Sequence, residues 1–418
     1  MKKVEFPLDL FEKNEIKEKI VKVLDLGLCN NCLGRAFGMV GHGLSNYSRG
    51  KIIRELIKND KKIEWKEKWE EAKVCSVCKN FFKEKLEDIA NKIIKKISKI
   101  EFETYLVGSV VYSELTKNEE KIWEIIGIEY AESIKSEINR EIGKIIEKKT
   151  GKKFDPKNPD LTVVVDLESE NIKIQMKSLY VYGEYQKLVR GIPQSKWICS
   201  NCKGKGCLKC KGIGKMYKTS VQEIIEKPFI KSSKAKKTAF HSAGREDIDA
   251  RNLAWRPFVI ELKKPIKRKI KLKEIQKKIN KSKKVKVRKL KFVEKYFIKK
   301  IKSERWDKTY LAIVKFENEI DKDKLKNIKS LEIEPVLQKT PLRVLHRRSD
   351  KIRKRKVKKI SWKIIDKKTL ELKIRAESGL YIKELINGDE GRTKPSIAEI
   401  LNNKVKKISL DVIKIHTK

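Results

Sequence analysis

Residues 240–251 have the sequence FHSAGREDIDAR, and this segment indicates the fold and chemistry of the chain more strongly than any other. Two carboxylates, Asp247 and Asp249, lie between Arg245 and Arg251, directly after a glycine. Glycine permits an unusual backbone angle or the close approach of a ligand. A neighbouring opposite charge keeps a carboxylate ionised, and an ionised aspartate can act as a nucleophile. The segment predicts a reactive carboxylate, and the alternative is a polar loop whose charges neutralise one another.

Strands are expected on both sides of this segment, at 221–225 and 256–262. Residues 261–300 contain nineteen Lys or Arg against three Glu. Because apolar positions recur through this region, it predicts a helix and a strand with a basic face. A phosphate-binding surface is favoured over a solvated face without a partner. Further strands are expected at 308–314 and 370–375, where the sequence is rich in apolar and alternating residues.

The part of the chain before the segment has a different pattern. Residues 83–150 have mostly helical spacing, with a strand expected near 104–111. The run PDLTVVVDL at 159–167 predicts a buried strand, and residues 172–176 alternate as a second strand does. Helices followed by paired strands indicate a separate α/β module.

The charge of the chain indicates its partner. The 418 residues, enough for two or three domains, include 103 Lys and Arg against 57 Asp and Glu, a formal net charge of +46. So large an excess repels itself unless a polyanion neutralises it, so nucleic acid is the expected partner and binding should weaken with salt. A genome bias or a hot habitat is the alternative, but either would raise Lys and Glu together.

The sequence contains no apolar stretch of about eighteen residues, so no transmembrane helix is expected. Its first twenty residues lack an uninterrupted apolar segment and a small-residue cleavage site, so they do not indicate a secretory signal. We expect a cytoplasmic protein that is not bound to a membrane. Nothing indicates an obligate protein partner, so we expect a monomer.

All eight cysteines occur in Cys-x-x-Cys pairs, which indicate metal sites before disulfides in a reducing compartment. Cys29 pairs with Cys32, and Cys75 pairs with Cys78 after a lysine-rich helical segment. Four thiolates from two such pairs suit a tetrahedral, structural zinc ion. The alternative is two unrelated buried or redox pairs, although no strand-turn-helix pattern precedes Cys29 to support a redox role.

A second cluster consists of Cys199, Cys202, Cys207 and Cys210, with only four residues between its two pairs. Nearby glycines allow tight turns, and six lysines between residues 196 and 215 surround the cysteines. This spacing predicts a second structural zinc site on a basic finger near RNA, and it resembles the zinc modules of certain chaperones. The alternative is a purely structural staple in a long insertion. Both clusters lie far from Asp247 in sequence, so zinc is expected to have no chemical role.

The segment at 244–247 resembles the Gly-Arg-x-Asp signature of pseudouridine synthases. The longer run GREDIDARNLAWRPFVIEL, residues 244–262, closely resembles the version in the archaeal tRNA pseudouridine-54/55 synthase family. The resemblance implies that Asp247 is the catalytic residue, with Asp249 as the alternative two positions later. An ionised Asp247 needs a cationic partner, for which Arg245 and Lys383 are the candidates.

Two later segments carry the same resemblance in the same chain order. On its residues alone, Tyr310 in the run KTYLAIV is more typical of a core, but the resemblance implies that it stacks on the target base. The run ESGLYIKEL resembles the Gly-x-Tyr-Ile-Lys/Arg segment of these enzymes. It implies that Lys383 pairs with the catalytic carboxylate, that Ile382 packs beneath the base and that Tyr381 lies near the substrate. The apolar Leu410 follows near the end.

Two further similarities complete the expected architecture. The knuckle at Cys29, with Gly-Arg after Cys32, resembles the N-terminal zinc site of the same family, and residues 70–190 resemble a THUMP-type RNA-binding module. An unrelated α/β insertion is the alternative for the latter. The run 347–359, with nine Lys or Arg in thirteen residues, resembles a strand and loop that face RNA.

We therefore expect an α+β protein. A pseudouridine-synthase domain with a mixed, mainly antiparallel sheet follows a separate zinc-containing, THUMP-like α/β accessory domain. The expected boundaries are 1–190 for the accessory domain, 191–218 for a zinc-knuckle insertion or linker, and 219–418 for the catalytic domain.

The resemblance implies isomerisation of uridines 54 and 55 in the T arm of tRNA, with a catalytic Asp, two structural zinc sites and no organic cofactor. The sequence does not distinguish modification of one uridine from modification of both. A THUMP-type methyltransferase is one alternative, but it needs a glycine-rich nucleotide loop after a strand, which we do not find. A non-catalytic zinc-containing RNA-binding protein is the other, and it leaves the ordered Asp, Tyr and Lys segments unexplained.

Overall fold

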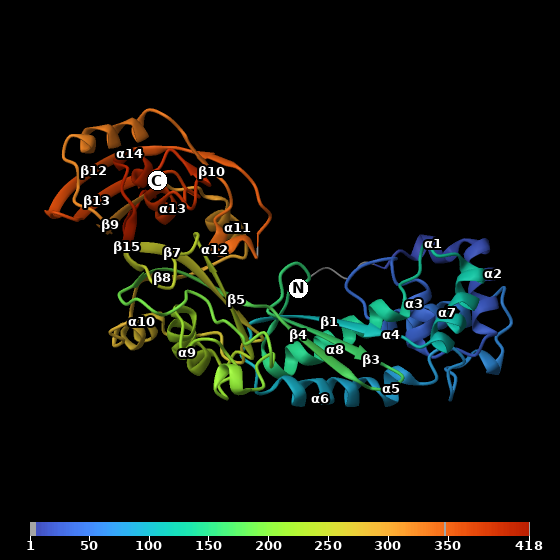
Figure 1. Ribbon diagram of the computed structural model, residues 1–418. Helices are drawn as coiled ribbons and strands as arrows, with labels where there is room; N and C mark the ends of the chain where they lie inside the picture. Colours follow the sequence, from blue (N-terminus) through green and yellow to red (C-terminus); the bar gives the residue numbers. More distant parts are fainter. Residues whose placement is uncertain (1–5, 347, 418) are drawn as a thin grey trace. The chain divides into compact units, whose positions relative to one another are not determined.

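The structure, a computed structural model, describes residues 6–346 and 348–417 (Figure 1). It divides into two compact units, Met1–Lys177 and Ser178–Lys418, which we describe separately. Within the described ranges, none of the helices combines the length and the apolar character needed to cross a membrane.

The first unit is built from helices that surround a small sheet. Its helices are α1 (Leu8–Glu12), α2 (Asn14–Leu24), α3 (Asn30–Ala36), α4 (Asn46–Lys58), the 3-10 helix η1 (Glu67–Trp69), α5 (Phe81–Glu84), α6 (Leu86–Ile97), α7 (Ser113–Ile126) and α8 (Ile134–Thr150). Its strands are β1 (Thr104–Val110), β2 (Lys153–Phe154), β3 (Leu161–Asp166) and β4 (Ile172–Met176), in the order β2-β1-β3-β4. Strand β1 is parallel to β2 and β3, whereas β3 and β4 are antiparallel.

Helix α8 shows how the sequence specifies this unit. Isoleucines at every fourth position from Ile134 to Ile146 are completely buried and form one face of the helix, which packs against β1 and α6. The Ser133 side chain accepts a hydrogen bond from the backbone of Ser136 and caps the first turn. Gly151, with a φ of +68°, ends the helix in the left-handed conformation. The expected α/β module is therefore present.

The second unit is organised by an eight-stranded sheet with the order β12-β13-β9-β15-β7-β5-β8, in which β6 also pairs with β7. These strands are β5 (Leu179–Lys187), β6 (Lys237–Ser242), β7 (Arg251–Lys263), β8 (Val285–Val293), β9 (Lys308–Phe316), β12 (Val357–Asp366), β13 (Thr369–Ala376) and β15 (Val405–Ile415). The contact between β15 and β7 is parallel, and the other pairings described for this sheet are antiparallel. The expected mixed, mainly antiparallel sheet is confirmed.

Helices and a second, small sheet complete this unit. The small sheet has the order β11-β10-β14, formed by β10 (Val336–Gln338), β11 (Arg353–Arg355) and β14 (Thr393–Lys394). The helices are α9 (Val221–Ser233), α10 (Leu272–Asn280), α11 (Tyr296–Ser303), α12 (Leu342–Leu345), α13 (Ile382–Asn387) and α14 (Ile397–Leu401), with the 3-10 helices η2 (Leu208–Cys210) and η3 (Lys324–Glu332). Helices α9 and α10 contact the β8 end of the large sheet, and η3 contacts β12 at the opposite end.

The structure differs from the sequence-based expectations in two places. The strand predicted at 221–225 is wrong, because Val221, Ile225 and Phe229 are completely buried at a spacing of four and form the inner face of α9. The first unit also ends at Lys177, earlier than the expected residue 190. The physical reason is that β5 pairs with β7 and β8 and so belongs to the large sheet.

Candidate active site

A pocket of about 780 Å³ opens in the second unit between the loop that precedes β7, strands β9 and β15, and the start of α13. Every side chain predicted to act in catalysis or substrate binding lines it, although these residues are spread from 245 to 410 in the chain. They are Arg245, Asp247, Asp249, Tyr310, Tyr381, Ile382, Lys383 and Leu410.

Asp247 lies in the pocket with one third of its side chain exposed. Its Oδ1 accepts a hydrogen bond from Nη1 of Arg343 at 3.0 Å, and Nζ of Lys383 lies 3.8 Å from Oδ2. Arg343 is held in turn by Glu384, with 2.6 Å between Nε and Oε1. Among the described residues, the cation closest to the carboxylate of Asp247 is therefore Arg343, which sequence reasoning did not single out.

Lys383 contacts both aspartates but is closer to Asp249. Its Nζ donates to Oδ1 and Oδ2 of Asp249 at 2.7 and 2.6 Å. Burial opposes the charge on Asp249, but the hydrogen bond and charge of Lys383 offset this effect, and the pKa of Asp249 is lowered overall. Asp249 thus positions the lysine between the two carboxylates.

A buried lysine fixes the backbone at Asp247. Lys187 at the end of β5 is completely buried, and its Nζ donates to the carbonyl oxygens of Asp247 (2.8 Å), Ile192 (3.0 Å) and Ile248 (3.2 Å). Burial lowers the pKa of Lys187. An ammonium group has three donors, so these carbonyls use its full capacity and hold the loop in one position.

The carboxylate next to Asp247 has different partners. Glu246 is buried, accepts a hydrogen bond from the hydroxyl of Tyr185 at 2.9 Å, and lies 3.1 Å from Nε of Arg256. Arg256 donates to the carbonyl of Ala243 at 2.9 Å, so this pair anchors the start of the loop. Gly244 adopts a φ of +73°, the left-handed conformation that its lack of a Cβ allows. The two carboxylates of the signature therefore have different tasks, since Glu246 is buried and anchors the loop, whereas Asp247 is partly exposed in the pocket.

Strand β15 is tied to the same loop. Oδ1 of Asp411 accepts a hydrogen bond from Nη2 of Arg190 at 2.5 Å. Oδ2 of Asp411 forms an ion pair with Nη2 of Arg251 at 2.6 Å. Arg190 also donates to the backbone carbonyls of Asp249 (2.8 Å) and Leu410 (2.6 Å). These contacts bring Leu410 to the pocket, where only 6% of this residue is exposed.

Tyr310 and Lys308 project from β9 into the pocket, two positions apart on one face of the strand. Burial raises the pKa of Tyr310 to about 12, so its hydroxyl stays protonated at neutral pH. Burial and the charge of Arg256 lower the pKa of Lys308 to about 8. Nζ of Lys308 donates to the carbonyl of Trp306 at 3.2 Å. This wall therefore offers an aromatic ring beside a weakly basic amine.

The opposite wall is formed by the residues around α13. The backbone of Tyr381 exchanges two hydrogen bonds with the Gln338 side chain, at 2.8 and 3.0 Å, and its hydroxyl accepts from Arg348 at 2.6 Å. Ile382 is 4% exposed and, with Leu410, gives the pocket an apolar floor. Such a floor suits the face of a planar base.

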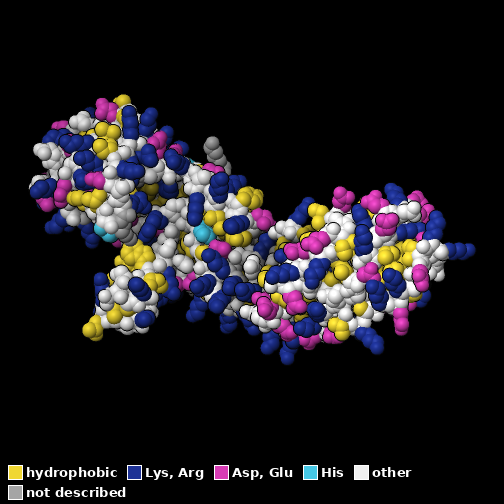
Figure 2. Space-filling model, turned by 90° about the vertical axis from the view of Figure 1, so that its right-hand side faces the viewer, with side chains coloured by type: hydrophobic (Ala, Val, Ile, Leu, Met, Phe, Trp, Pro, Cys, Tyr) yellow, Lys and Arg dark blue, Asp and Glu magenta, His cyan; other side chains and the backbone are white. Residues whose placement is uncertain are grey.

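Among the described residues, eight cationic side chains line the pocket that contains the two aspartates: Arg245, Arg256, Lys308, Arg343, Arg348, Arg353, Arg355 and Lys383. Three of these arginines belong to the basic run 347–359, whose first residue, Arg347, lies outside the described residues. Lysine and arginine side chains are also spread widely over the face shown in Figure 2. A cationic rim around a partly apolar pocket suits a nucleotide with its phosphates.

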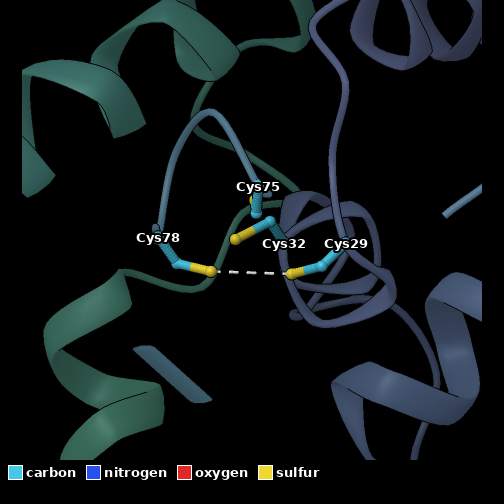
Figure 3. A group of neighbouring side chains, drawn as sticks. All are labelled: Cys29, Cys32, Cys75 and Cys78. Atoms are coloured by element: carbon cyan, nitrogen blue, oxygen red, sulfur yellow. Dashed lines mark hydrogen bonds between the residues drawn. The ribbon is translucent and has the colours of Figure 1, made fainter. Parts of the chain in front are cut away.

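The first cysteine tetrad lies within the first unit (Figure 3). Cys29 and Cys32 at the start of α3 face Cys75 and Cys78, and all four Sγ atoms lie within 4.8 Å of one another. The Sγ atoms of Cys29 and Cys78 are 3.6 Å apart. Zinc–sulfur bonds of about 2.3 Å in a tetrahedron place sulfur atoms about 3.8 Å apart. The tetrad therefore fits a zinc ion.

Two glycines allow the helix crossing that supports this tetrad. A Cβ on Gly34 of α3 would lie 1.8 Å from the carbonyl oxygen of Asn46, and one on Gly50 of α4 would lie 2.0 Å from that of Asn30. Both distances are shorter than side-chain carbons tolerate, so the two helices pack backbone to backbone. Arg54 of α4 donates to the Leu28 carbonyl at 3.0 Å, beside the first cysteine.

The geometry of the second tetrad also suits a metal ion. The sulfur atoms of Cys199, Cys202, Cys207 and Cys210 lie within 4.8 Å of one another, with measured pairs at 3.7 to 3.9 Å. The backbone amides of Gly206 and Gly214 donate to Sγ of Cys202 and Cys210 at 3.2 Å. Such amide–sulfur bonds stabilise thiolates and orient metal ligands.

Comparison with known proteins agrees with this geometry. The family model "Pus10, C-terminal" matches residues 180–416, and "Pus10 THUMP domain, archaeal" matches residues 89–166. The chain is 38% identical to "tRNA pseudouridine synthase Pus10" of Methanothrix thermoacetophila, with 98% of this chain and 97% of that protein covered. It is 40% identical to the protein of that name from Pyrococcus furiosus, with 96% and 98% covered.

Among solved structures, a Cbf5-Nop10-Gar1 complex matches at 15% identity with a TM-score of 0.29. That match covers 55% of this chain and 47% of the other. At this TM-score it adds nothing to the family models.

Proposed function

The chain belongs to the Pus10 family of tRNA pseudouridine synthases, and we propose that it isomerises uridines 54 and 55 of the T arm with Asp247 as the catalytic residue. The observation that carries this proposal is one pocket that contains Asp247, Tyr310, Lys383 and Leu410. Family membership favours this isomerase over the methyltransferase and the non-catalytic RNA-binding protein considered from the sequence.

The chemistry explains why a carboxylate is needed. The bond from uracil N1 to ribose C1′ breaks and uracil C5 then joins C1′. C5 loses its hydrogen to solvent as a proton and N1 gains a proton, so the atoms balance with no change of redox state and no organic cofactor. A carboxylate must lie beside the sugar and the detached base, whether it attacks carbon or removes a proton from the sugar. Arg343 engages Oδ1 of Asp247 at 3.0 Å, which leaves Oδ2 as the oxygen available to the substrate.

The remaining pocket residues recognise the nucleotide. The target uridine must leave its stack, which costs a few kcal/mol. Stacking on the ring of Tyr310 returns about 1–3 kcal/mol. Ile382 and Leu410 support the other side of the base, and Lys383, held by Asp249 at 2.6 Å, keeps a positive charge near the reacting carboxylate. Tyr381 with Arg348, and Arg245 at the rim, contact the sugar-phosphate backbone.

Both cysteine tetrads are assigned to structural zinc, which holds the chain together and takes no part in the isomerisation. The partner is tRNA, and recognition depends on the folded shape of the T arm together with phosphate contacts. We assign the enzyme to the cytoplasm and expect it to act as a monomer.

Tritium release from tRNA labelled at uridine C5 tests the proposal. Transcripts that keep only uridine 54 or only uridine 55 in the T loop assign the target. Asp247→Ala should abolish release while tRNA binding at fixed salt stays near that of the unaltered enzyme. Asp247→Asn, which preserves shape, should be equally inactive.

Asp249→Ala is the matched control and should be less severe. Activity retained by Asp247→Ala but lost by Asp249→Ala would transfer the catalytic role to Asp249. Full activity in both variants would overturn the assignment of this pocket.

A further inference from the structure

The second cysteine tetrad lies on a two-stranded ribbon whose base reaches the active site. Ile198 pairs antiparallel with Lys215, the amide of Met216 donates to the carbonyl of Trp197 at 2.9 Å, and the amide of Cys199 donates to Gly214 at 3.0 Å. Cys199 therefore lies only two positions from Trp197 along a paired segment. A metal ion that fixes the position of Cys199 would therefore also fix the backbone that carries the Trp197 side chain.

Trp197 is part of the pocket wall. Its indole lines the same cavity as Asp247, and the guanidinium carbon of Arg245 lies 5.8 Å from the ring centroid. Tyr217, from the returning side of the ribbon, meets the indole edge-on at 5.5 Å. Arg245 is two residues before Asp247, so the indole stands beside the catalytic motif and is held from two directions.

This arrangement has a use when a uridine leaves its stack, because the neighbouring base then loses a partner. An aromatic ring backed by a guanidinium group is a common platform for an unstacked base. The indole at the pocket wall is placed to take that neighbour, whereas Tyr310 takes the target itself.

We propose that Trp197 is a nucleobase-binding residue that stacks on the base adjacent to the target uridine, and that metal in the second tetrad fixes the ribbon that presents it. The inference rests on the proposed function, since it needs a nucleotide extruded into this pocket. It gives the second tetrad a task in substrate recognition beyond stabilising the fold.

The test uses full-length enzyme with Asp247→Ala, so that no turnover occurs, and a tRNA with 2-aminopurine next to the target uridine. Stacking on an indole quenches this fluorophore. Quenching should persist with Trp197→Phe. It should disappear with Trp197→Ala and Trp197→Leu, and these two variants should bind the tRNA roughly tenfold more weakly. Trp255→Ala is the matched control, because Trp255 lies 4.2 Å from the guanidinium of Arg288 but does not line the pocket.

The metal is tested with Cys207→Ser. This variant should lose one zinc per chain by metal analysis and lose the quenching, while its melting transition remains cooperative. Quenching unchanged in Trp197→Ala and Trp197→Leu would overturn the role of Trp197. Quenching retained after zinc loss would overturn the role of the metal. Fluorescence reports binding alone, whereas turnover retained by Asp247→Ala would instead refute the proposed catalytic residue.

Discussion

Replacement of Lys187 by Met removes the ammonium group that holds the backbone of residues 243–250, the loop between β6 and β7 that contains Asp247. Met has a similar volume, so the change deletes three hydrogen bonds to backbone carbonyls without opening a large cavity. The carbonyls of Asp247 and Ile248 keep the amides of Ala250 and Gly191 as donors. A buried polar group left without a partner costs about 1–3 kcal/mol. The mutation also removes a buried charge, whose desolvation costs the folded state several kcal/mol, and this removal stabilises the fold. Because the two effects oppose each other, we expect the free energy of unfolding to fall by at most about 1–3 kcal/mol.

The larger effect should be on the reaction. Without Lys187 the carbonyl of Asp247 keeps only the longer hydrogen bond from the amide of Ala250, at 3.2 Å, and is held less firmly. A displacement of about 1 Å at a reacting group can lower a rate about 100-fold. Single-turnover tritium release should slow by about that factor, whereas tRNA affinity should change little, because Lys187 is completely buried. Urea unfolding measures the stability loss in the same samples.

The pH dependence gives a second check. Burial lowers the pKa of Lys187 in the folded chain. Between this lowered pKa and the ordinary value, the unfolded chain binds more protons, so the free energy of unfolding rises with pH. The stability difference between the unaltered enzyme and Lys187→Met should therefore grow as the pH rises through this window.

The matched control is Lys286→Met, which removes a lysine of the same sheet that donates to one carbonyl, that of Asn280 at 3.0 Å. It should leave the single-turnover rate unchanged. A normal rate in Lys187→Met would refute the reasoning that this lysine positions Asp247.

Arg343→Lys should lower the single-turnover rate about tenfold and Arg343→Ala more, because lysine cannot contact Asp247 and Glu384 together as the planar guanidinium does; equal rates in both variants would contradict this. Metal analysis of protein purified without chelators should give about two zinc per chain, and a value near zero would exclude zinc in the tetrads. Affinity for tRNA should fall steeply with salt, and Arg353→Ala should reduce the magnitude of the slope of log affinity against log salt by about one; an affinity independent of salt would oppose phosphate contacts.

The family resemblance identified side chains that meet in the pocket, because their types are tied to short, recognisable segments. Asp247 follows Gly-Arg-x, Tyr310 begins a strand, and Lys383 follows Gly-x-Tyr-Ile. Their meeting depends on the neighbouring positions of β9, β15 and β7 in the sheet. Segment order alone contains no distances, so the sequence did not reveal that Lys383 is closer to Asp249 than to Asp247.

The supporting residues were missed for a different reason. Arg343 and Asp247 are 96 positions apart, and Arg343 was one cation among many in a basic region. Lys187 has the pattern of an ordinary strand lysine, and only the packing of β5 beside β7 makes it buried. Similarly, five residues at 221–225 are too few to distinguish a strand from the first turn of a helix.

Strand β7 pairs with β5, β6 and β15, and the loop that contains Asp247 leads directly into it. Its amide protons should exchange with solvent only when the whole unit unfolds. The arginine-bearing rim depends instead on β10, β11 and β14, which have only three, three and two residues, and its amides should exchange through brief local openings. We therefore expect the rim to open locally far more often than β7 unfolds. Such local opening would admit an RNA arm while Asp247 keeps its place.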